Sequence, residues 1–289
     1  MPDVFRAVSA YRLNHRPFFD KMLTPSPLAG QPATCIFPHR RAAGAAAAQL
    51  VQSEIARKVA TNGRSRVIFA CAPSQDDFYA ALVPLARATP DIWRQVEAFH
   101  MDDYVGLTAA HPQSFRHYLQ RHFLDHVTVG SFHPIQGEAA DSAAEARRYG
   151  DLLRAAPIDV IAMGIGENGH IAFNDPSVAD FADPTTVKIV ELDTACRQQQ
   201  VNDGCFPTID QVPRLAFSIT LPVFAHADLL CCLASTARKA AAVRAALTGP
   251  IGRACPATLL CTHPRAHLFL DPAAASLLSA GLIAQYRAE

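Results

Sequence analysis

The stretch IDVIAMGIGENGHIAFNDP, residues 158–176, joins the pattern of a buried strand to glycines, a histidine and carboxylates. Residues 158–163 are apolar and rich in β-branched side chains, which is typical of a strand inside a parallel sheet covered on both faces. Ligands bind beyond the C-terminal ends of such strands, so the next residues are expected at a binding site. Their glycines match G-x-G-x-x-G, but the following proline and Asn-Asp pair oppose the helix that a nucleotide site needs. A tight turn with a merely packed His170 is the structural alternative.

A second apolar run, residues 96–99, also ends in carboxylates, Asp102 and Asp103. The C-terminal ends of parallel strands lie along one edge of a sheet, and the loops there converge. We therefore expect Asp102, His170 and Asp175 to face a common cleft. Asp103 is expected to be a surface or turn carboxylate without a chemical role.

Strand-like and helix-like segments alternate along the chain of 289 residues, about half of which are hydrophobic. This predicts an α/β fold: a single domain with a mostly parallel, doubly wound (Rossmann-like) sheet and helices on both faces. Residues 35–289 are expected to form this domain, and residues 1–34 an N-terminal extension that packs as a short helix. The strand-like runs are 66–70, 96–99, 158–163, 187–191, 214–219, 228–233 and 267–270, and the helix-like segments are 41–61, 76–88, 113–124, 142–155, 237–247 and 272–286.

Five segments resemble the glucosamine-6-phosphate deaminase branch of the sugar-phosphate isomerase and 6-phosphogluconolactonase superfamily: MDDYVGL, HPQSF, MGIGENGHIAFNDP, RQQQVNDGCF and CPATLLCTHP. The match runs from about Cys35 to the C-terminus, and residues 171–176 follow the deaminase pattern rather than that of the lactonases. The resemblance implies an isomerising deamination of an amino-sugar phosphate, most simply glucosamine 6-phosphate and water to fructose 6-phosphate and ammonia. Such an enzyme is a hydrolase or isomerase acting on a C–N bond, and no metal or organic cofactor is implied.

By motif position, Asp102 resembles the base that takes the C2 proton, and His170 resembles the residue that moves a proton during ring opening. Asn168 and Asp175 occupy supporting positions. These residue types suit the chemistry, because a carboxylate can accept a carbon-bound proton and an imidazole titrates near neutrality. Asp175 would orient His170 and stabilise its cation, although the family usually has the longer Glu at this position.

The phosphate end departs from the family pattern. Residues 71–77, CAPSQDD, replace a Gly-Gly-Thr loop, and Gly204 stands where the family's lid has an arginine. Ser74 is expected to cap the helix that starts near residue 76. The residues expected to bind substrate or its phosphate are Ser74, Gln75, Gly166, Gly169 and Lys239. The sequence thus supports the reaction class more strongly than the phosphate group.

The formal net charge of zero gives no electrostatic basis for binding nucleic acid or an anionic membrane. The sequence shows no signal-peptide pattern and no apolar stretch of the roughly 20 residues that span a bilayer. We therefore expect a cytoplasmic protein, a homo-oligomer, whose partner is a small-molecule sugar phosphate. The eight cysteines lack C-x-x-C spacing, so buried free thiols are expected, with Cys71 and Cys205 near the site.

Three alternative functions stay open. The first is a deaminase or isomerase of a different amino sugar. The second is a 6-phosphogluconolactonase-like hydrolase in which His170 would activate water. The third is a catalytically weak sugar-sensing protein, because related folds also serve as effector-binding domains.

Overall fold

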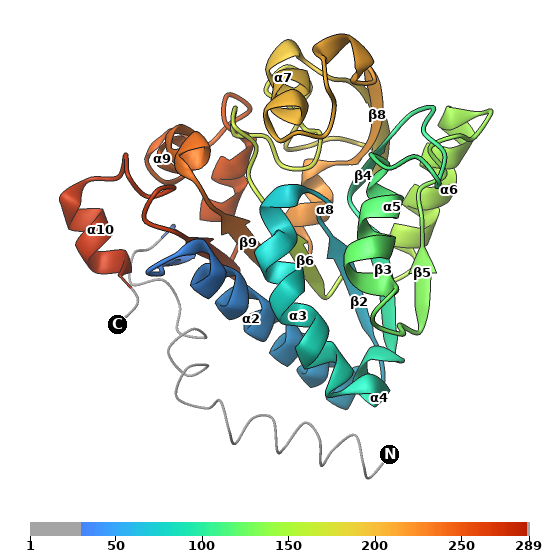
Figure 1. Ribbon diagram of the computed structural model, residues 1–289, viewed down its shortest axis with the longest axis horizontal. Helices are drawn as coiled ribbons and strands as arrows, with labels where there is room; N and C mark the ends of the chain where they lie inside the picture. Colours follow the sequence, from blue (N-terminus) through green and yellow to red (C-terminus); the bar gives the residue numbers. More distant parts are fainter. Residues whose placement is uncertain (1–29, 288–289) are drawn as a thin grey trace.

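The computed structural model describes residues 30–287, and its centre is a seven-stranded sheet in which every strand pairs parallel to its neighbours (Figure 1). The mostly parallel α/β fold predicted from the sequence is confirmed. Residues 1–29 of the predicted N-terminal extension lie outside the described residues. In spatial order the strands are β1 (Ala33–Ile36), β10 (Ala266–Leu270), β9 (Leu229–Ala234), β6 (Val160–Met163), β2 (Ser65–Phe69), β3 (Val96–His100) and β5 (Ser131–His133).

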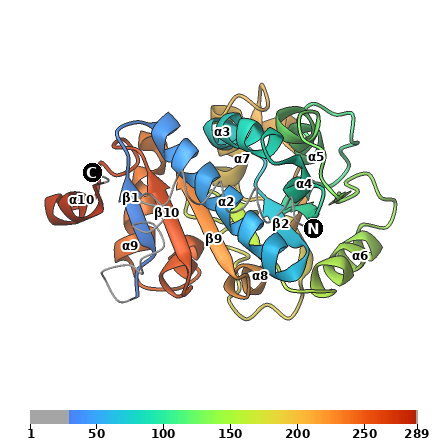
Figure 2. The ribbon, with the colours of Figure 1, turned by 90° about the horizontal axis from the view of Figure 1, so that it is seen from below.

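Helices cover both faces of this sheet, as predicted (Figures 1 and 2). Val67 and Phe69 of β2 belong to the core cluster under α2 and α3, whereas Ile68 between them belongs to the cluster under α6 and α9. Strands buried on both faces explain the near-continuous apolar runs in the sequence. The helices are α2 (Arg40–Asn62), α3 (Asp76–Arg87), α4 (Pro90–Trp93), α5 (Phe115–Leu119), α6 (Ser142–Arg154), α7 (Thr194–Asn202), α8 (Leu221–Ala225), α9 (Ala240–Thr248) and α10 (Ala280–Tyr286).

The alanine-rich helix α2 packs closely against α3. The His39 side chain caps its N-terminus by accepting a hydrogen bond from the Ala42 N–H, and Gly63 ends it with a φ of +74°. A Cβ added at Gly44 would lie 2.8 Å from the carbonyl carbon of Asp77, which is closer than side chains approach. Small residues on α2 therefore let the two helices touch, and α3 begins at the edge of the sheet where ligands bind.

Three further strands form a separate antiparallel sheet in the order β4 (Asp102–Tyr104), β8 (Leu215–Ile219) and β7 (Val187–Glu191). The sequence runs 187–191 and 214–219 were expected in the parallel sheet, and that placement is wrong. Strand β7 is only partly buried, because Val187 and Val190 are buried whereas Ile189 and Glu191 are exposed, and antiparallel sheets can keep one face in solvent. Of the predicted helix 272–286, only α10 is helical, and residues 272–277 form turns.

The strand order reverses between β2 and β6. From β2 the chain moves outward through β3 to β5, and from β6 it moves the other way through β9 to β10. The loops after β2 and β6 consequently leave in opposite directions and open a crevice between them. Such a switch point is where open α/β sheets bind their ligands.

Candidate active site

A cavity lies at this switch point, at the C-terminal edge of the sheet. Its lining brings together Asp102, which follows β3, and His170, which follows β6. A larger hollow of about 570 Å³ near α6 and α8 contains none of the residues predicted to act in the site. The polar and glycine residues that line the cavity are Ser74, Gln75, Asp102, Gly164, Gly166, His170, Gln199, Gln200 and Lys239.

Asp102 is the first residue of β4, where its backbone pairs with Ser218 of β8. The side chain is only 5% exposed, and no described residue donates a hydrogen bond to its carboxylate. Burial, and then the neighbouring charge of Asp103, raise the pKa of Asp102 well above its usual range. Once ionised, this carboxylate is therefore a stronger base than an exposed aspartate.

His170 lies beside a buried carboxylate. Its Nδ1 is 3.0 Å from Oδ1 of Asp175, although the ring N–H is not aligned with that oxygen. The Asn168 Nδ2 donates to the same oxygen at 3.0 Å, and the Asn168 Oδ1 accepts from the His170 backbone N–H at 3.0 Å. Burial raises the pKa of Asp175, but the contacts with His170 and Asn168 outweigh it and leave that pKa below its usual value. Asp175 and Asn168 thus lie behind His170 and support it.

The turn that carries His170 needs its glycines. A Cβ added at Gly166 would overlap the imidazole ring, so the ring rests directly on this residue. Gly169 has a φ of +87°, and a Cβ there would meet Sγ of Cys255 at 2.6 Å. Gly169 therefore shapes the turn from behind, whereas Gly166 lines the cavity. The turn is tied to β8 by the Phe173 N–H, which donates to Oγ of Ser218 at 3.1 Å.

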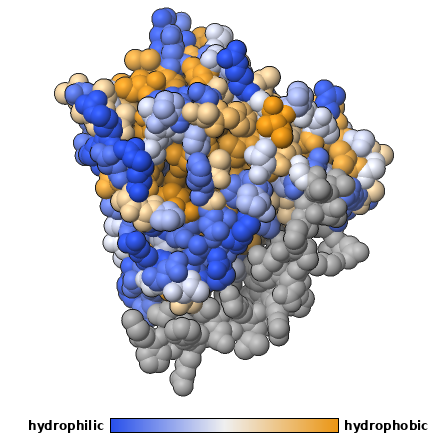
Figure 3. All heavy atoms as spheres, turned by 180° about the vertical axis from the view of Figure 1, so that it is seen from behind, coloured by the Kyte–Doolittle hydropathy of each residue, from blue (hydrophilic) through white to orange (hydrophobic). Residues whose placement is uncertain are grey.

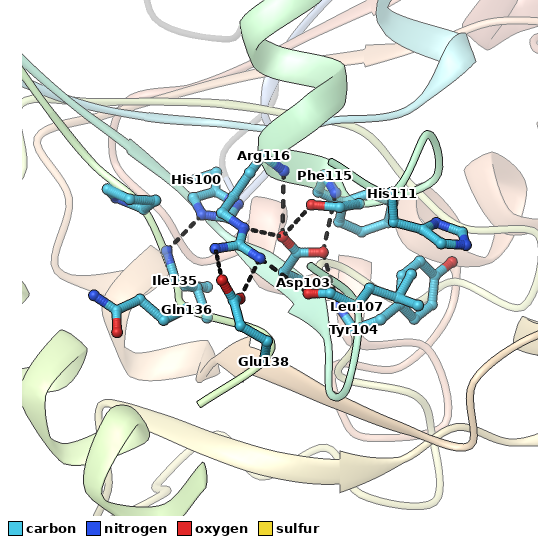
Figure 4. A network of polar contacts seen from close by, with 12 residues as sticks. His100, Asp103, Tyr104, Leu107, His111, Phe115, Arg116, Ile135, Gln136 and Glu138 are labelled. Carbon is cyan, nitrogen blue, oxygen red and sulfur yellow. Dashed lines mark hydrogen bonds and ion pairs between the residues drawn. The ribbon is translucent and has the colours of Figure 1, made fainter. Parts of the chain in front are cut away.

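Asp103 is fully buried, which corrects the expectation of a surface carboxylate. Figure 4 shows it within a network of polar contacts. Its carboxylate accepts hydrogen bonds from the backbone N–H groups of Tyr104, Phe115 and Arg116 at 2.9, 3.0 and 3.2 Å. The Arg116 guanidinium lies 3.5 Å away. Asp103 therefore fixes the start of α5, whose Phe115 lines the cavity. Phe115 and Arg116 lie 12 and 13 residues along the chain from Asp103, so local sequence does not reveal them.

Lys239 follows β9 and ends a short 3₁₀ helix, Ala237–Lys239. It is only 5% exposed, and its ammonium group makes no hydrogen bond or ion pair with any residue in 30–287. Burial lowers the pKa of Lys239, and the charges of Asp203 and Glu167 oppose that effect. A second hollow of about 230 Å³ shares Ser74 and Lys239 with the cavity, so the lysine stands between the two.

Ser74 lines the cavity but does not cap α3, so that prediction is wrong. It lies inside a 3₁₀ turn, Pro73–Gln75, and Gln75 takes the N-cap position of α3 without a capping hydrogen bond from its side chain. Because the turn adds residues between β2 and the helix, the serine side chain is not placed over the first helical N–H groups.

Residues of α7 were missed, because the sequence indicated no helix there. The signal was present: Asp193 caps the helix by accepting from the Cys196 N–H at 2.7 Å, and a polar helix-compatible run follows. The helix brings Gln199 and Gln200 into the lining. Cys71 also lines the cavity, as the sequence suggested, whereas Cys205 packs against the core.

One group in the described chain combines potential metal ligands: His170, Asp175 and Cys196, whose ligand atoms all lie within 4.8 Å of one another. Burial and then the Asp175 charge raise the pKa of the Cys196 thiol well above its usual value. A thiol must ionise to bind a metal tightly, so this environment disfavours ligation. The arrangement suits proton transfer better than metal binding.

The family model for glucosamine-6-phosphate isomerases/6-phosphogluconolactonase matches residues 38–269. Similar relatives include the glucosamine-6-phosphate deaminase of Listeria monocytogenes, 35% identical over 78% of this chain and 93% of its own. The glucosamine-6-phosphate deaminase of Cellvibrio japonicus is 34% identical over 70% of this chain and 76% of its own. Among solved structures, a monomeric glucosamine-6-phosphate deaminase is 27% identical with a TM-score of 0.77, covering 84% of this chain and 99% of its own. The 6-phosphogluconolactonase of Trypanosoma brucei, 16% identical with a TM-score of 0.71 over 86% and 99%, shares the fold. The resemblance read from the motifs is confirmed: the chain belongs to the glucosamine-6-phosphate isomerase/6-phosphogluconolactonase family.

Proposed function

We propose that the protein deaminates and isomerises glucosamine 6-phosphate to fructose 6-phosphate and ammonia. The observation that carries this proposal is that a buried carboxylate and an imidazole, Asp102 and His170, line one cavity with a buried Lys239 whose ammonium has no ion-pair partner within residues 30–287. The deaminases at 34–35% identity support it. Because water is taken up when the C–N bond breaks, the reaction is both an isomerisation and a hydrolysis.

Ring opening is assigned to His170. The imidazole takes the proton of the anomeric hydroxyl and returns a proton to the ring oxygen, which breaks the C1–O5 bond and leaves an open-chain aldehyde. Asp175, which its contacts keep ionised, stabilises the imidazolium that forms between the two transfers. Asn168 holds both Asp175 and the turn in place.

Proton transfer between C2 and C1 is assigned to Asp102. The ionised carboxylate removes the C2 proton and delivers it to C1, while one proton passes from the C2 ammonium to O1, so that C1 becomes a CH2OH group and C2 a protonated imine. Water then adds to the imine, and ammonia departs to give the ketone. The raised pKa of Asp102 brings it closer to that of the carbon acid, which favours proton removal. A substrate ammonium beside Asp102 would favour its ionised form by attraction.

Ammonia release from purified protein tests the proposal. We would offer glucosamine 6-phosphate, glucosamine and galactosamine 6-phosphate in parallel, with Asp102→Asn as the control. Fast release from glucosamine 6-phosphate alone, lost in the variant, is the expected result. Release from another sugar would instead assign a different amino sugar. Absence of release from all three would refute the deaminase function, and hydrolysis of 6-phosphogluconolactone would then be measured.

The homo-oligomer and the cytoplasmic location stay predictions. No helix in residues 30–287 is long and apolar enough to cross a membrane. Figure 3 shows apolar residues gathered in patches among hydrophilic ones on the face opposite that of Figure 1. The similar solved deaminase is described as monomeric, so sedimentation velocity at several concentrations is the direct test.

A further inference from the structure

Helix α7 begins beside the turn that carries His170. Its N-cap residue, Asp193, is the second residue after β7 and is half-buried. Asp193 lies 25 residues along the chain from Asn168 and 18 from Asp175, yet it is hydrogen-bonded to both. The antiparallel sheet, a helix that lines the cavity and the groups behind His170 therefore meet at this one residue.

The two carboxylate oxygens of Asp193 have different partners. Oδ1 accepts from the Cys196 N–H at 2.7 Å and so caps α7. Oδ2 accepts from the Asn168 Nδ2 at 3.4 Å. The same Nδ2 donates to Asp175 at 3.0 Å, so the two hydrogens of one amide join two carboxylates. Asn168 thus connects the residue that caps α7 to the carboxylate beside His170.

The backbone of Asp193 adds a second link. Its N–H donates at 3.4 Å to Oδ2 of Asp175, the oxygen that Asn168 does not contact. Asp175 is fully buried, so the protein has to supply a partner for each of its oxygens. Asn168 and the Asp193 N–H do so, and they fix this carboxylate 3.0 Å from Nδ1 of His170.

An N-cap needs one acceptor, and Asp193 supplies two. The second oxygen is the one directed at Asn168, so helix capping alone does not account for it. We propose that Asp193 is a positioning residue for His170, which acts through Asn168 and Asp175 and joins the imidazole to the start of α7. Because α7 also lines the cavity, the link fixes that wall relative to the imidazole. The effect on ring opening rests on the proposed function, whereas the link itself does not.

Asp193→Ser separates this role from helix capping. Serine is about as good an N-cap as aspartate, but its single side-chain oxygen cannot bond both the helix and Asn168. The lost hydrogen bond involves a charged group, so we expect kcat for glucosamine 6-phosphate to fall about 10-fold. The KM should change less than about threefold, and the melting temperature should stay close to that of the wild type.

Asp141→Ser is the matched control. Asp141 caps α6, and within residues 30–287 its carboxylate accepts only from the Ala144 N–H, at 2.9 Å. The same substitution at the start of another helix should therefore leave kcat unchanged. Wild-type kcat in a folded Asp193→Ser protein would overturn the inference, and so would an equal loss of kcat in Asp141→Ser.

A double-mutant cycle with Asn168→Ala shows whether the two residues act together. If Asp193 acts through Asn168, then Asp193→Ser should cost less than about twofold in kcat once Asn168 is alanine. A purely structural effect of Asp193 would instead lower kcat by the same factor in both backgrounds. Such independent losses would contradict the proposed route to His170.

A measurement without turnover keeps this test separate from that of the function. In protein labelled with 15N-histidine, the imidazole resonances of His170 are assigned by their loss in His170→Gln. They should shift in Asp193→Ser but not in Asp141→Ser. Unchanged His170 resonances in Asp193→Ser overturn the inference even in an active enzyme. A wild type that releases no ammonia refutes the function, and the resonances then still decide the positioning.

Discussion

Gly166→Ala is the substitution that most directly tests how the turn positions His170. The added Cβ would overlap the imidazole ring, and the backbone of Gly166 is not in the left-handed region. The substitution should therefore displace the His170 imidazole without straining the backbone at residue 166. Gly164→Ala is its matched control, two residues earlier in the same turn.

The magnitude follows from the overlap. To restore ordinary van der Waals separation, the imidazole would have to withdraw by about 1 Å. A displacement of about 1 Å in a catalytic group can cost about 100-fold in rate, or about 2.7 kcal/mol in activation free energy. At Gly164 the new Cβ would instead lie 3.0 Å from the Gln75 Nε2, so only the carboxamide needs to shift slightly.

Steady-state ammonia release, together with thermal unfolding, measures both variants. Gly166→Ala should lower kcat about 100-fold with little change in melting temperature. Gly164→Ala should keep kcat within a few-fold and act mainly on KM, because it touches Gln75 rather than His170. A folded Gly166→Ala protein with wild-type kcat would refute the argument that the histidine is positioned by this glycine.

Three further predictions concern the carboxylates. Asp102 must be ionised to act as a base, and its pKa is raised, so the acidic limb of the kcat/KM profile should have its midpoint above about pH 4, the usual value for an aspartate. An acidic limb with its midpoint at about pH 4 would contradict this. Because the pKa of Asp102 is raised in the folded state, its contribution to stability is lost as the pH rises through that pKa. Asp102→Asn should therefore raise the free energy of unfolding, measured in urea at neutral pH. A lower free energy of unfolding would refute the raised pKa of Asp102. Asp103→Ala removes one of the two carboxylates beside the buried Arg116, Glu138 being the other, and leaves the backbone N–H groups of Phe115 and Arg116 without their acceptor. It should therefore lower that free energy by about 3–5 kcal/mol, whereas a loss below about 1 kcal/mol would show that the network is dispensable.

The parallel sheet was predictable because its strands are buried on both faces and leave continuous apolar runs. The antiparallel strands were assigned to the wrong sheet, because a short run such as 187–191 specifies a strand but not its neighbours. The helix α7 was missed since its residues are polar and its hydrophobic pattern is weak. Its two cavity glutamines were therefore missed as well.

The sequence alone was enough to indicate the class of fold, the edge of the sheet that binds ligands, and Asp102 and His170 as candidates. These follow from local patterns, namely hydrophobic periodicity and the residue types that end each strand. Only the tertiary structure decided that Asp103 is a buried cap, that Ser74 is not one, and that Gln75 and Gln200 face the cavity beside Lys239. The burial of a side chain and its hydrogen-bond partners depend on residues distant in the chain, so they are determined only when the helices and strands pack together.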